Sequence, residues 1–298
     1  MTGSAPRRAA YLPFLALAFL ALVWGYNWVV MKVAVRDCDP FTFAALRNLL
    51  AAIALFGVAL LRGDSLRPKA FWWTALYGAL QTSLSGLAVW AVYLGSAGRT
   101  SVLTYSMPFW LLALAWPLLG ERIRGLQWAA VALALVGLIF ILAPWDLRGW
   151  EASALAVGGG LSWAIASVFF KIVNKRHELE LVSFTAWQTL LGSLPLIVIA
   201  VLVDPAGPDW TGSLIVALVY NVIIASAVAY VIWMYVLQNL PAGTAGISSL
   251  AIPVVGVVAA WVQLGERPGV PEAVGMGLIL AALAILTARG LLLNRRVS

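Results

Sequence analysis

The side chains that could bind a small solute lie inside long apolar segments rather than in loops. One face of the helix expected over 71–94 carries four of them at helical spacing: Thr74, Tyr77, Gln81 and Ser85. A helix face turned toward lipid gains nothing from such groups, so we expect it to face a cavity or a neighbouring helix. Amides, hydroxyls and aromatic rings together suit a neutral amphipathic zwitterion, whereas sugar phosphates usually demand deep Lys or Arg.

Other apolar segments offer candidates of the same kind. We predict that the substrate contacts the following side chains: Trp24, Asn27, Tyr77, Gln81, Ser85, Tyr105, Trp163, Ser167, Tyr230, Ser248 and Ser249. Hydrogen bonds between helices are the alternative role for each Ser. Pro108 and Pro253 each remove a backbone donor, so we predict kinks there that serve as gating hinges, with plain helix bending as the alternative.

Groups for bond-making chemistry are scarce. All twelve acidic residues fall in loops or near the ends of apolar segments, Cys38 is the only cysteine, and His177 lies in a basic loop. Hydrolysis or group transfer needs paired carboxylates, a metal cluster or an activated nucleophile, so we expect no enzyme, metal site or cofactor. Proton-coupled carriers usually need a titratable group in the pathway, which favours facilitated transport here.

Two charges, Lys32 and Arg47, do fall inside apolar segments. Long basic side chains can reach the membrane surface from that depth, where Asp37 and Asp39 could meet them. We expect this anchoring role, and a role facing the substrate is the alternative.

Composition places the whole chain in a membrane. Of the 298 residues 63% are hydrophobic and 10% charged, and the mean hydropathy is +0.96. A soluble domain averages about half apolar and a quarter charged residues, and it has no core that could use so much apolar surface. The net charge of +7 is assigned to basic cytoplasmic loops rather than to nucleic-acid binding.

Ten segments are long and apolar enough to span a bilayer: 11–35, 41–61, 71–94, 99–119, 126–143, 150–171, 181–203, 211–237, 243–264 and 272–293. If the N-terminus lies inside, thirteen of the nineteen Lys and Arg residues fall in cytoplasmic segments and four in outer loops. This bias predicts that both termini are cytoplasmic.

The two halves of the sequence resemble each other. Trp24 and Lys32 match Trp163 and Lys171 at an offset of 139, and Arg47 matches Gln188 at 141. Ala97-Gly98, Pro108 and Gly120-Glu121-Arg122 match Ala242-Gly243, Pro253 and Gly265-Glu266-Arg267 at 145. Five spans per half is an odd number, so residues 1–145 and 146–298 are predicted to be inverted repeats, as in many transporters.

These features resemble the drug/metabolite transporter superfamily, in particular its EamA-type members and most nearly the YddG-type amino-acid exporters. The resemblance rests on the ten spans, Trp24-Gly25-x-Asn27-Trp28, the two prolines and the paired Gly-Glu-Arg tripeptides. It implies an all-α membrane protein with ten helices around a central cavity, working as a monomer. It also implies export of amino acids and related metabolites.

The function expected from sequence is therefore broad-selectivity amino-acid export through the lipid bilayer of a bacterial inner membrane, by alternating access. A proton-coupled efflux carrier for organic cations or drugs is the alternative, and a buried carboxylate would favour it.

Overall fold

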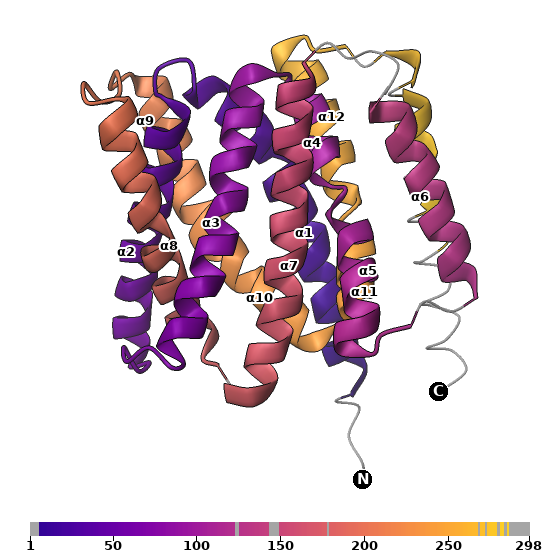
Figure 1. The fold of residues 1–298 in the computed structure, drawn as a ribbon, viewed down its shortest axis with the longest axis horizontal. Helices are drawn as coiled ribbons and strands as arrows, with labels where there is room; N and C mark the ends of the chain where they lie inside the picture. The colour runs from indigo at the N-terminus through magenta and orange to yellow at the C-terminus, as the bar shows by residue number, and fades with distance from the viewer. Residues whose placement is uncertain are drawn as a thin grey trace.

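The structure is a computed structural model that describes residues 6–122, 125–142, 149–177, 179–267, 269–271, 273–278, 281–282 and 285. These residues form helices and no strands (Figure 1). The helices are α1 (Pro6–Ala34), α2 (Pro40–Arg62), α3 (Phe71–Leu94), α4 (Ala97–Thr104), α5 (Met107–Leu119), α6 (Leu126–Leu142), α7 (Trp150–His177), α8 (Leu181–Val203), α9 (Gly212–Val219), η1 (Tyr220–Val228), α10 (Ala229–Asn239), α11 (Ala242–Ser248) and α12 (Ala251–Leu264).

Eight stretches of the described chain are helical, long and apolar enough to cross a bilayer: Leu12–Ala34, Pro40–Arg62, Phe71–Leu94, Ala97–Leu119, Trp150–His177, Leu181–Val203, Gly212–Asn239 and Ala242–Leu264. They coincide with eight of the predicted spans. The predicted span 126–143 corresponds to the shorter helix α6, of 17 residues. The predicted span 272–293 falls largely outside the described residues.

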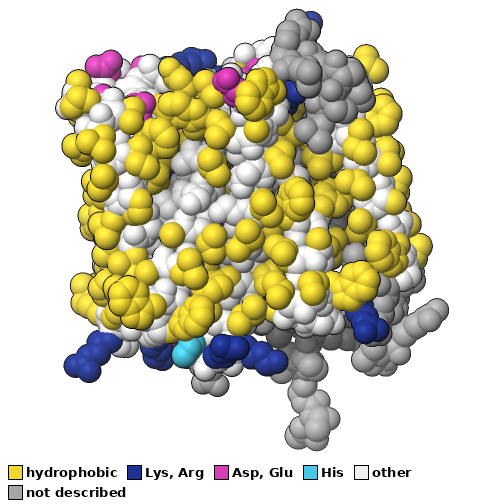
Figure 2. All heavy atoms as spheres, viewed as in Figure 1, with side chains coloured by type: hydrophobic (Ala, Val, Ile, Leu, Met, Phe, Trp, Pro, Cys, Tyr) yellow, Lys and Arg dark blue, Asp and Glu magenta, His cyan; other side chains and the backbone are white. Residues whose placement is uncertain are grey.

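The helices stand side by side with an apolar outer surface. Leu61, Trp72 and Val262 are 91%, 81% and 80% exposed, which is expected of side chains that face lipid. On the face drawn in Figure 2, Lys and Arg side chains gather mainly along the lower edge, whereas Asp and Glu appear along the upper edge. On this outer face, charge therefore lies at the two edges, where headgroups and water would meet it.

The two edges are named here after the lysines they carry. Helix α1 begins at the lower edge of Figure 1 and α7 ends there, so this is the Lys171 edge. Helix α1 ends and α7 begins at the opposite edge, which is the Lys32 edge.

Helices α2 and α8 form an antiparallel pair. The Thr42 hydroxyl donates to Asp204 Oδ2 (3.2 Å) where α2 begins and α8 ends, and the Ser183 hydroxyl donates to the Ser65 carbonyl (2.7 Å) at the other end. Helix α3 packs against α8 where Gly192 faces Gly78. A methyl group on Gly192 would overlap Thr82 Oγ1 and the Gly78 carbonyl oxygen, so glycine is needed for this approach.

The fourth and ninth predicted spans are broken rather than kinked. Helix α4 ends at Thr104 and α5 begins at Met107, while α11 ends at Ser248 and α12 begins at Ala251. Pro108 and Pro253 lie in the first turns of α5 and α12, where backbone N–H groups have no intrahelical acceptor. Each proline therefore lies just after an interruption of its span, and its role as a gating hinge stays a prediction.

At the Lys171 edge a glutamate connects the two halves of the chain. Gly120, with φ of 70°, ends α5 in the left-handed conformation and directs Glu121 across to α11. The Glu121 carboxylate accepts from the Ala242 and Gly243 backbone N–H groups at 3.0 and 3.1 Å. Lys171 Nζ lies 3.6 Å from Glu121 Oε1 and donates to the Leu240 carbonyl at 2.8 Å.

The Lys32 edge carries the corresponding group. Gly265, also with φ of 70°, precedes Glu266, whose carboxylate accepts from the Ala97 and Gly98 N–H groups at 3.3 and 3.1 Å. Lys32 Nζ donates to the Val92 and Gly95 carbonyls at 2.8 and 2.6 Å. The Glu266 carboxylate lies close enough to interact with Lys32 electrostatically.

The predicted anchoring of Lys32 and Arg47 by Asp37 and Asp39 is wrong, because all four side chains have other partners. Asp37 accepts from the Thr211 and Ser213 hydroxyls instead, and Asp39 caps the start of α2. Both glutamates of the Gly-Glu-Arg tripeptides contact helix starts in the other half of the chain.

Candidate functional site: a central aromatic cavity

A cavity opens inside the bundle between α1, α2, α3, the α4–α5 break, α7 and α10. It has about 480 Å³ of empty space, including the part open to solvent, and is lined by Trp24, Asn27, Trp28, Met31, Arg47, Gln81, Leu84, Ser85, Ala88, Thr104, Tyr105, Trp163 and Tyr230. Met31 and Ala88 come from the last turns of α1 and α3, and Arg47 from the first half of α2. The cavity therefore lies closer to the Lys32 edge than to the Lys171 edge.

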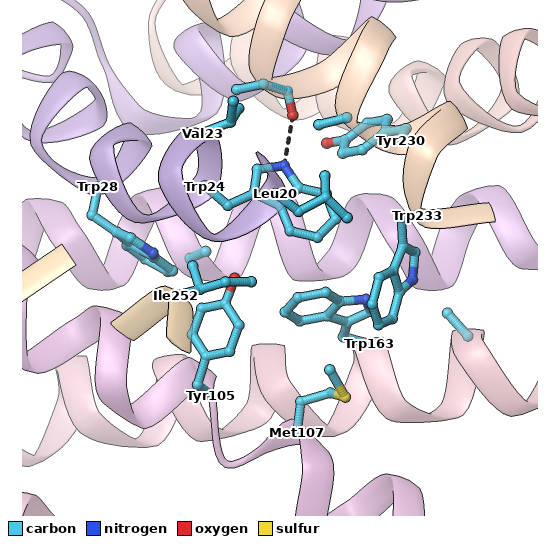
Figure 3. Close-up of a cluster of buried hydrophobic side chains, with 14 of the residues drawn as sticks. Leu20, Val23, Trp24, Trp28, Tyr105, Met107, Trp163, Tyr230, Trp233 and Ile252 are labelled. Carbon is cyan, nitrogen blue, oxygen red and sulfur yellow. Dashed lines mark hydrogen bonds between the residues drawn. The ribbon is translucent and has the colours of Figure 1, made fainter. Parts of the chain in front are cut away.

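Aromatic rings form one wall of the cavity (Figure 3). Trp163 packs edge-on against Trp24 (5.4 Å, 83°) and Tyr105 (5.3 Å, 78°), where the values are ring-centroid distances and interplanar angles. Trp233 lies behind them, 5.3 Å from Trp163 and 5.9 Å from Trp24. Such edge-to-face packing fixes the rings and offers π faces to apolar groups or cations.

The π-helix η1 positions Trp24. Trp24 Nε1 donates to the Ala225 carbonyl at 2.9 Å, the dashed line in Figure 3. The Tyr220 hydroxyl donates to the Val23 carbonyl at 2.8 Å, so η1 is bound to α1 at two neighbouring residues. Segments with π-helical geometry often occur at functional sites because they alter the register of the following side chains.

A buried arginine forms the polar side of the cavity. Arg47 is 5% exposed and places its guanidinium on Met31 Sδ (3.2 Å), Ser226 Oγ (3.3 Å) and the Tyr230 hydroxyl (3.3 Å). None of the acidic residues that the structure describes lines the cavity. Arg47 is therefore a fixed positive charge without an acidic partner among those residues.

Several cavity-lining polar atoms have no hydrogen-bond partner among the described residues: Asn27 Oδ1, Arg47 Nε, Gln81 Oε1, Thr104 Oγ1 and Trp163 Nε1. Buried polar groups in native proteins are nearly always satisfied, and each unsatisfied group costs about 1–3 kcal/mol. These atoms include both donors and acceptors. The cavity is therefore prepared for a ligand, or water, that offers both.

The predicted binding residues fall into two groups. Seven of them line the cavity: Trp24, Asn27, Gln81, Ser85, Tyr105, Trp163 and Tyr230. The other four lie outside its lining: Tyr77, Ser167, Ser248 and Ser249. The hydroxyls of Ser167 and Ser249 donate to the carbonyls of Trp163 and Gly246 in their own helical segments, at 2.9 and 2.7 Å.

Tyr77 belongs to an aromatic plug on the Lys171 side of the cavity. The plug consists of Tyr77, Phe170 and Phe184, with ring centroids 5.2 to 6.1 Å apart, and of Met234, whose sulfur accepts from the Tyr77 hydroxyl at 3.6 Å. Tyr77 and Phe170 are fully buried. Tyr77 shares a helix face with Gln81, as expected, but fills space instead of lining it.

The cavity also contains residues that the sequence analysis did not select, notably Thr104, Leu84 and Ala88, together with Arg47. Arg47 carried a visible signal, because it is a charge in the middle of an apolar segment. Thr104 gains its place from the break between α4 and α5, which composition does not reveal. In the described part of the chain, His, Cys, Asp and Glu do not gather in threes that could hold a metal ion.

With this fold and cavity, the chain can be compared with known proteins. The sequence profile of the EamA-like transporter family matches residues 12–143 and again residues 150–288. The chain belongs to this family and is a multi-pass membrane transporter.

Two curated relatives match almost the full chain. One from Salmonella typhimurium, named "Probable amino-acid metabolite efflux pump", is 32% identical over 288 residues, covering 91% of this chain and 93% of that protein. The "Uncharacterized transporter YoaV" of Bacillus subtilis is 27% identical over 280 residues, with the same coverage of 91% and 93%. A solved crystal structure, 21% identical, superposes with a TM-score of 0.75 over 96% of this chain and 98% of the other, which shows a shared fold.

Proposed function

We propose that this protein exports amino acids and related small metabolites with broad selectivity, as a facilitator that works by alternating access. The observation that carries the proposal is the cavity itself, where aromatic rings and unpartnered polar atoms from both halves of the chain face one space. Such a lining offers stacking for varied side chains and hydrogen bonds for an ammonium and a carboxylate. The name of the Salmonella relative agrees with this substrate class.

Alternating access is supported by the reciprocal contacts at the two edges. Lys32, Gly95, Ala97 and Glu266 at one edge correspond to Lys171, Leu240, Ala242 and Glu121 at the other, at offsets of 139 and 145. Each glutamate binds the helix start that matches the one bound by its counterpart. This exchange is what a two-fold axis in the membrane plane would produce, and it favours two inverted repeats divided near residue 145.

We further propose that the Lys171 edge faces the cytoplasm of a bacterial cell, that both termini lie on that side, and that the monomer is the working unit. The basic lower edge of Figure 2 supports this orientation because cytoplasmic loops carry the excess of Lys and Arg. The cavity then lies toward the outer side and the aromatic plug toward the cytoplasm.

The alternative, proton-coupled efflux of organic cations, is disfavoured by Arg47. A fixed guanidinium in the cavity repels a cationic substrate, and no described acidic residue lines the cavity to attract it or to carry a proton.

Counterflow in proteoliposomes tests the proposal. Vesicles loaded with unlabelled leucine should accumulate radiolabelled leucine, methionine and phenylalanine, and a pH gradient should leave the rate unchanged. Accumulation of labelled tetraphenylphosphonium but of no amino acid, or a rate that follows the pH gradient, contradicts it.

Two variants connect that flux to the cavity. Trp163→Ala removes the ring at the centre of the aromatic wall and should lower counterflow at least tenfold, because it removes stacking and the Nε1 donor together. Tyr77→Phe is the matched control, since the Tyr77 hydroxyl contacts only Met234 Sδ among the described residues and lies outside the cavity. Equal flux in both variants would remove the cavity from the transport path.

A further inference from the structure

Among the residues that the structure describes, Arg47 has no acidic partner, whereas a buried guanidinium normally has one. Its five N–H donors meet a thioether sulfur and two hydroxyl oxygens, each at 3.2 to 3.3 Å, and Nε meets no acceptor. Neutral partners at these distances compensate a desolvated charge poorly, and buried charges are ordinarily paired with acids. Two acids at the Lys32 edge have other partners. Asp37 accepts hydrogen bonds from Thr211 and Ser213, and Glu266 accepts from the backbone N–H groups at the start of α4.

The matching position in the other half of the chain carries no charge. Gln188 occupies the matching place on α8, the antiparallel partner of α2, and it is 1% exposed. Its amide nitrogen donates to Thr189 Oγ1 at 2.8 Å. One helix of the pair therefore packs with a neutral amide where the other has a guanidinium, which turns toward the cavity. A buried charge that costs desolvation energy, and that the matching position lacks, points to a ligand.

The rest of the lining complements a zwitterion. Asn27 Oδ1 and Gln81 Oε1 are buried acceptors without a donor among the described residues, which suits an ammonium group. The Trp24–Trp163–Tyr105 wall suits an apolar or aromatic side chain. The only chemical group still lacking is an anion for the guanidinium, and a planar carboxylate matches its fork with two parallel hydrogen bonds.

We propose that Arg47 binds the carboxylate of the substrate, so that the cavity selects α-amino acids and rejects the same side chains presented as amides or simple amines. This inference rests on the proposed amino-acid transport and names the group by which the site recognises its substrate. It also places the carboxylate on the α2 side of the cavity and the side chain on the α7 side.

Competition in counterflow tests the inference, with leucine, leucinamide and 3-methylbutylamine as unlabelled competitors against labelled leucine. In the wild-type protein leucine should compete at least tenfold better than either analogue, because only leucine pairs with Arg47. Arg47→Gln should weaken leucine about 10- to 100-fold and leave leucinamide within about threefold, so the preference disappears. Arg47→Lys should restore part of it, since the charge remains but the fork is lost.

Gln188→Ala is the matched control and should keep the wild-type preference for leucine over leucinamide. The ratio of the two competitors does not depend on how much protein is reconstituted, so a merely structural role of Arg47 would leave it unchanged. Equal competition by leucine and leucinamide in the wild-type protein overturns the inference even if Arg47→Gln does not fold. Absence of counterflow with any amino acid overturns the proposed function itself, which is a different result.

Discussion

The cavity lies toward the Lys32 edge and is hollow and polar, whereas the aromatic plug lies toward the Lys171 edge and is filled. Met31 in the cavity corresponds to Phe170 in the plug, Asn27 to the buried Ala166, and Arg47 to Gln188, at offsets of 139 to 141. At these positions the cavity side carries Asn27, Met31 and Arg47, whereas the matching residues are a small methyl group, a ring and a neutral amide. Sequence divergence at these matched positions therefore makes the cavity lining more polar than its counterpart.

Glycine substitutions on the two sides should give the largest difference between the plug and the cavity. Gly192→Ala on the plug side would drive a methyl into the Gly78 backbone, which only a shift of α3 can relieve, so we expect most of the folded protein to be lost. Gly256→Ala on the cavity side approaches the Ser101 hydroxyl (2.9 Å) and Trp28 (3.3 Å), which are side-chain rather than backbone atoms, so it should cost less. Monodisperse yield from gel filtration measures both, and Gly57→Ala, with no neighbour within 4 Å, is the control. Equal yields for all three would show that α3 and α8 are not packed as described.

The second-largest difference is expected when the matched residues Phe170 and Met31 are each truncated to alanine. Phe170→Ala removes a fully buried ring from the plug and should lower the free energy of unfolding by roughly 3–5 kcal/mol. Met31→Ala should cost less than half of that, because it borders the cavity, where space is already available. Thermal unfolding in detergent compares the two variants. A larger loss for Met31→Ala would reverse the assignment of filled and hollow sides.

The two edge glutamates give a smaller difference. Glu121→Ala removes acceptors for two backbone N–H groups and also the partner of Lys171, so we expect a loss of about 1.5–3 kcal/mol. Glu266→Ala should cost somewhat less, because the two carbonyls of Val92 and Gly95 still hold Lys32. Melting temperatures of both variants, with Glu151→Ala as a control at the start of α7, rank them. The opposite order would show that the two edges are not held as described.

The smallest effect concerns pH at the Lys32 edge. Hydrogen bonds from the Thr211 and Ser213 hydroxyls lower the pKa of Asp37, so this carboxylate stabilises the folded state above its unfolded pKa of about 3.9. That contribution is lost as the pH falls through the folded-state pKa. Ser213→Ala should therefore melt slightly below the wild-type protein at pH 7, and the two should converge once the pH falls below the folded-state pKa of Asp37. A difference that persists in acid would assign the effect to something other than the ionised carboxylate.

Much of this architecture could be predicted from the sequence, because apolar length and periodicity are local properties. The spacing of Tyr77, Gln81 and Ser85 correctly placed them on one buried helix face. It could not separate Tyr77 from Gln81, since depth along that face is decided by Phe170 and Phe184 on other helices. Helical periodicity predicts which face of the helix is buried. Only the packing of other helices decides whether a side chain on that face contacts an aromatic ring or lines a cavity.

Arg47 shows the same limit for charge. Its position in an apolar segment was evident, but its partners Ser226 and Tyr230 are 179 and 183 residues away in sequence. The helix interruptions after Thr104 and Ser248 could not be predicted from the sequence either. A proline indicates irregular backbone but not whether the helix bends or ends and begins again.

Labelling of a single cysteine in the cavity tests the central claim most directly. In a Cys38→Ser background, Ala88→Cys should react with a small maleimide added from outside the cell, and saturating leucine should slow that reaction severalfold. Ala166→Cys, at the buried position that matches Asn27, should not react with the maleimide, whether or not leucine is present. If leucine and every other transported amino acid leave the Ala88→Cys rate unchanged, the cavity is not the substrate site.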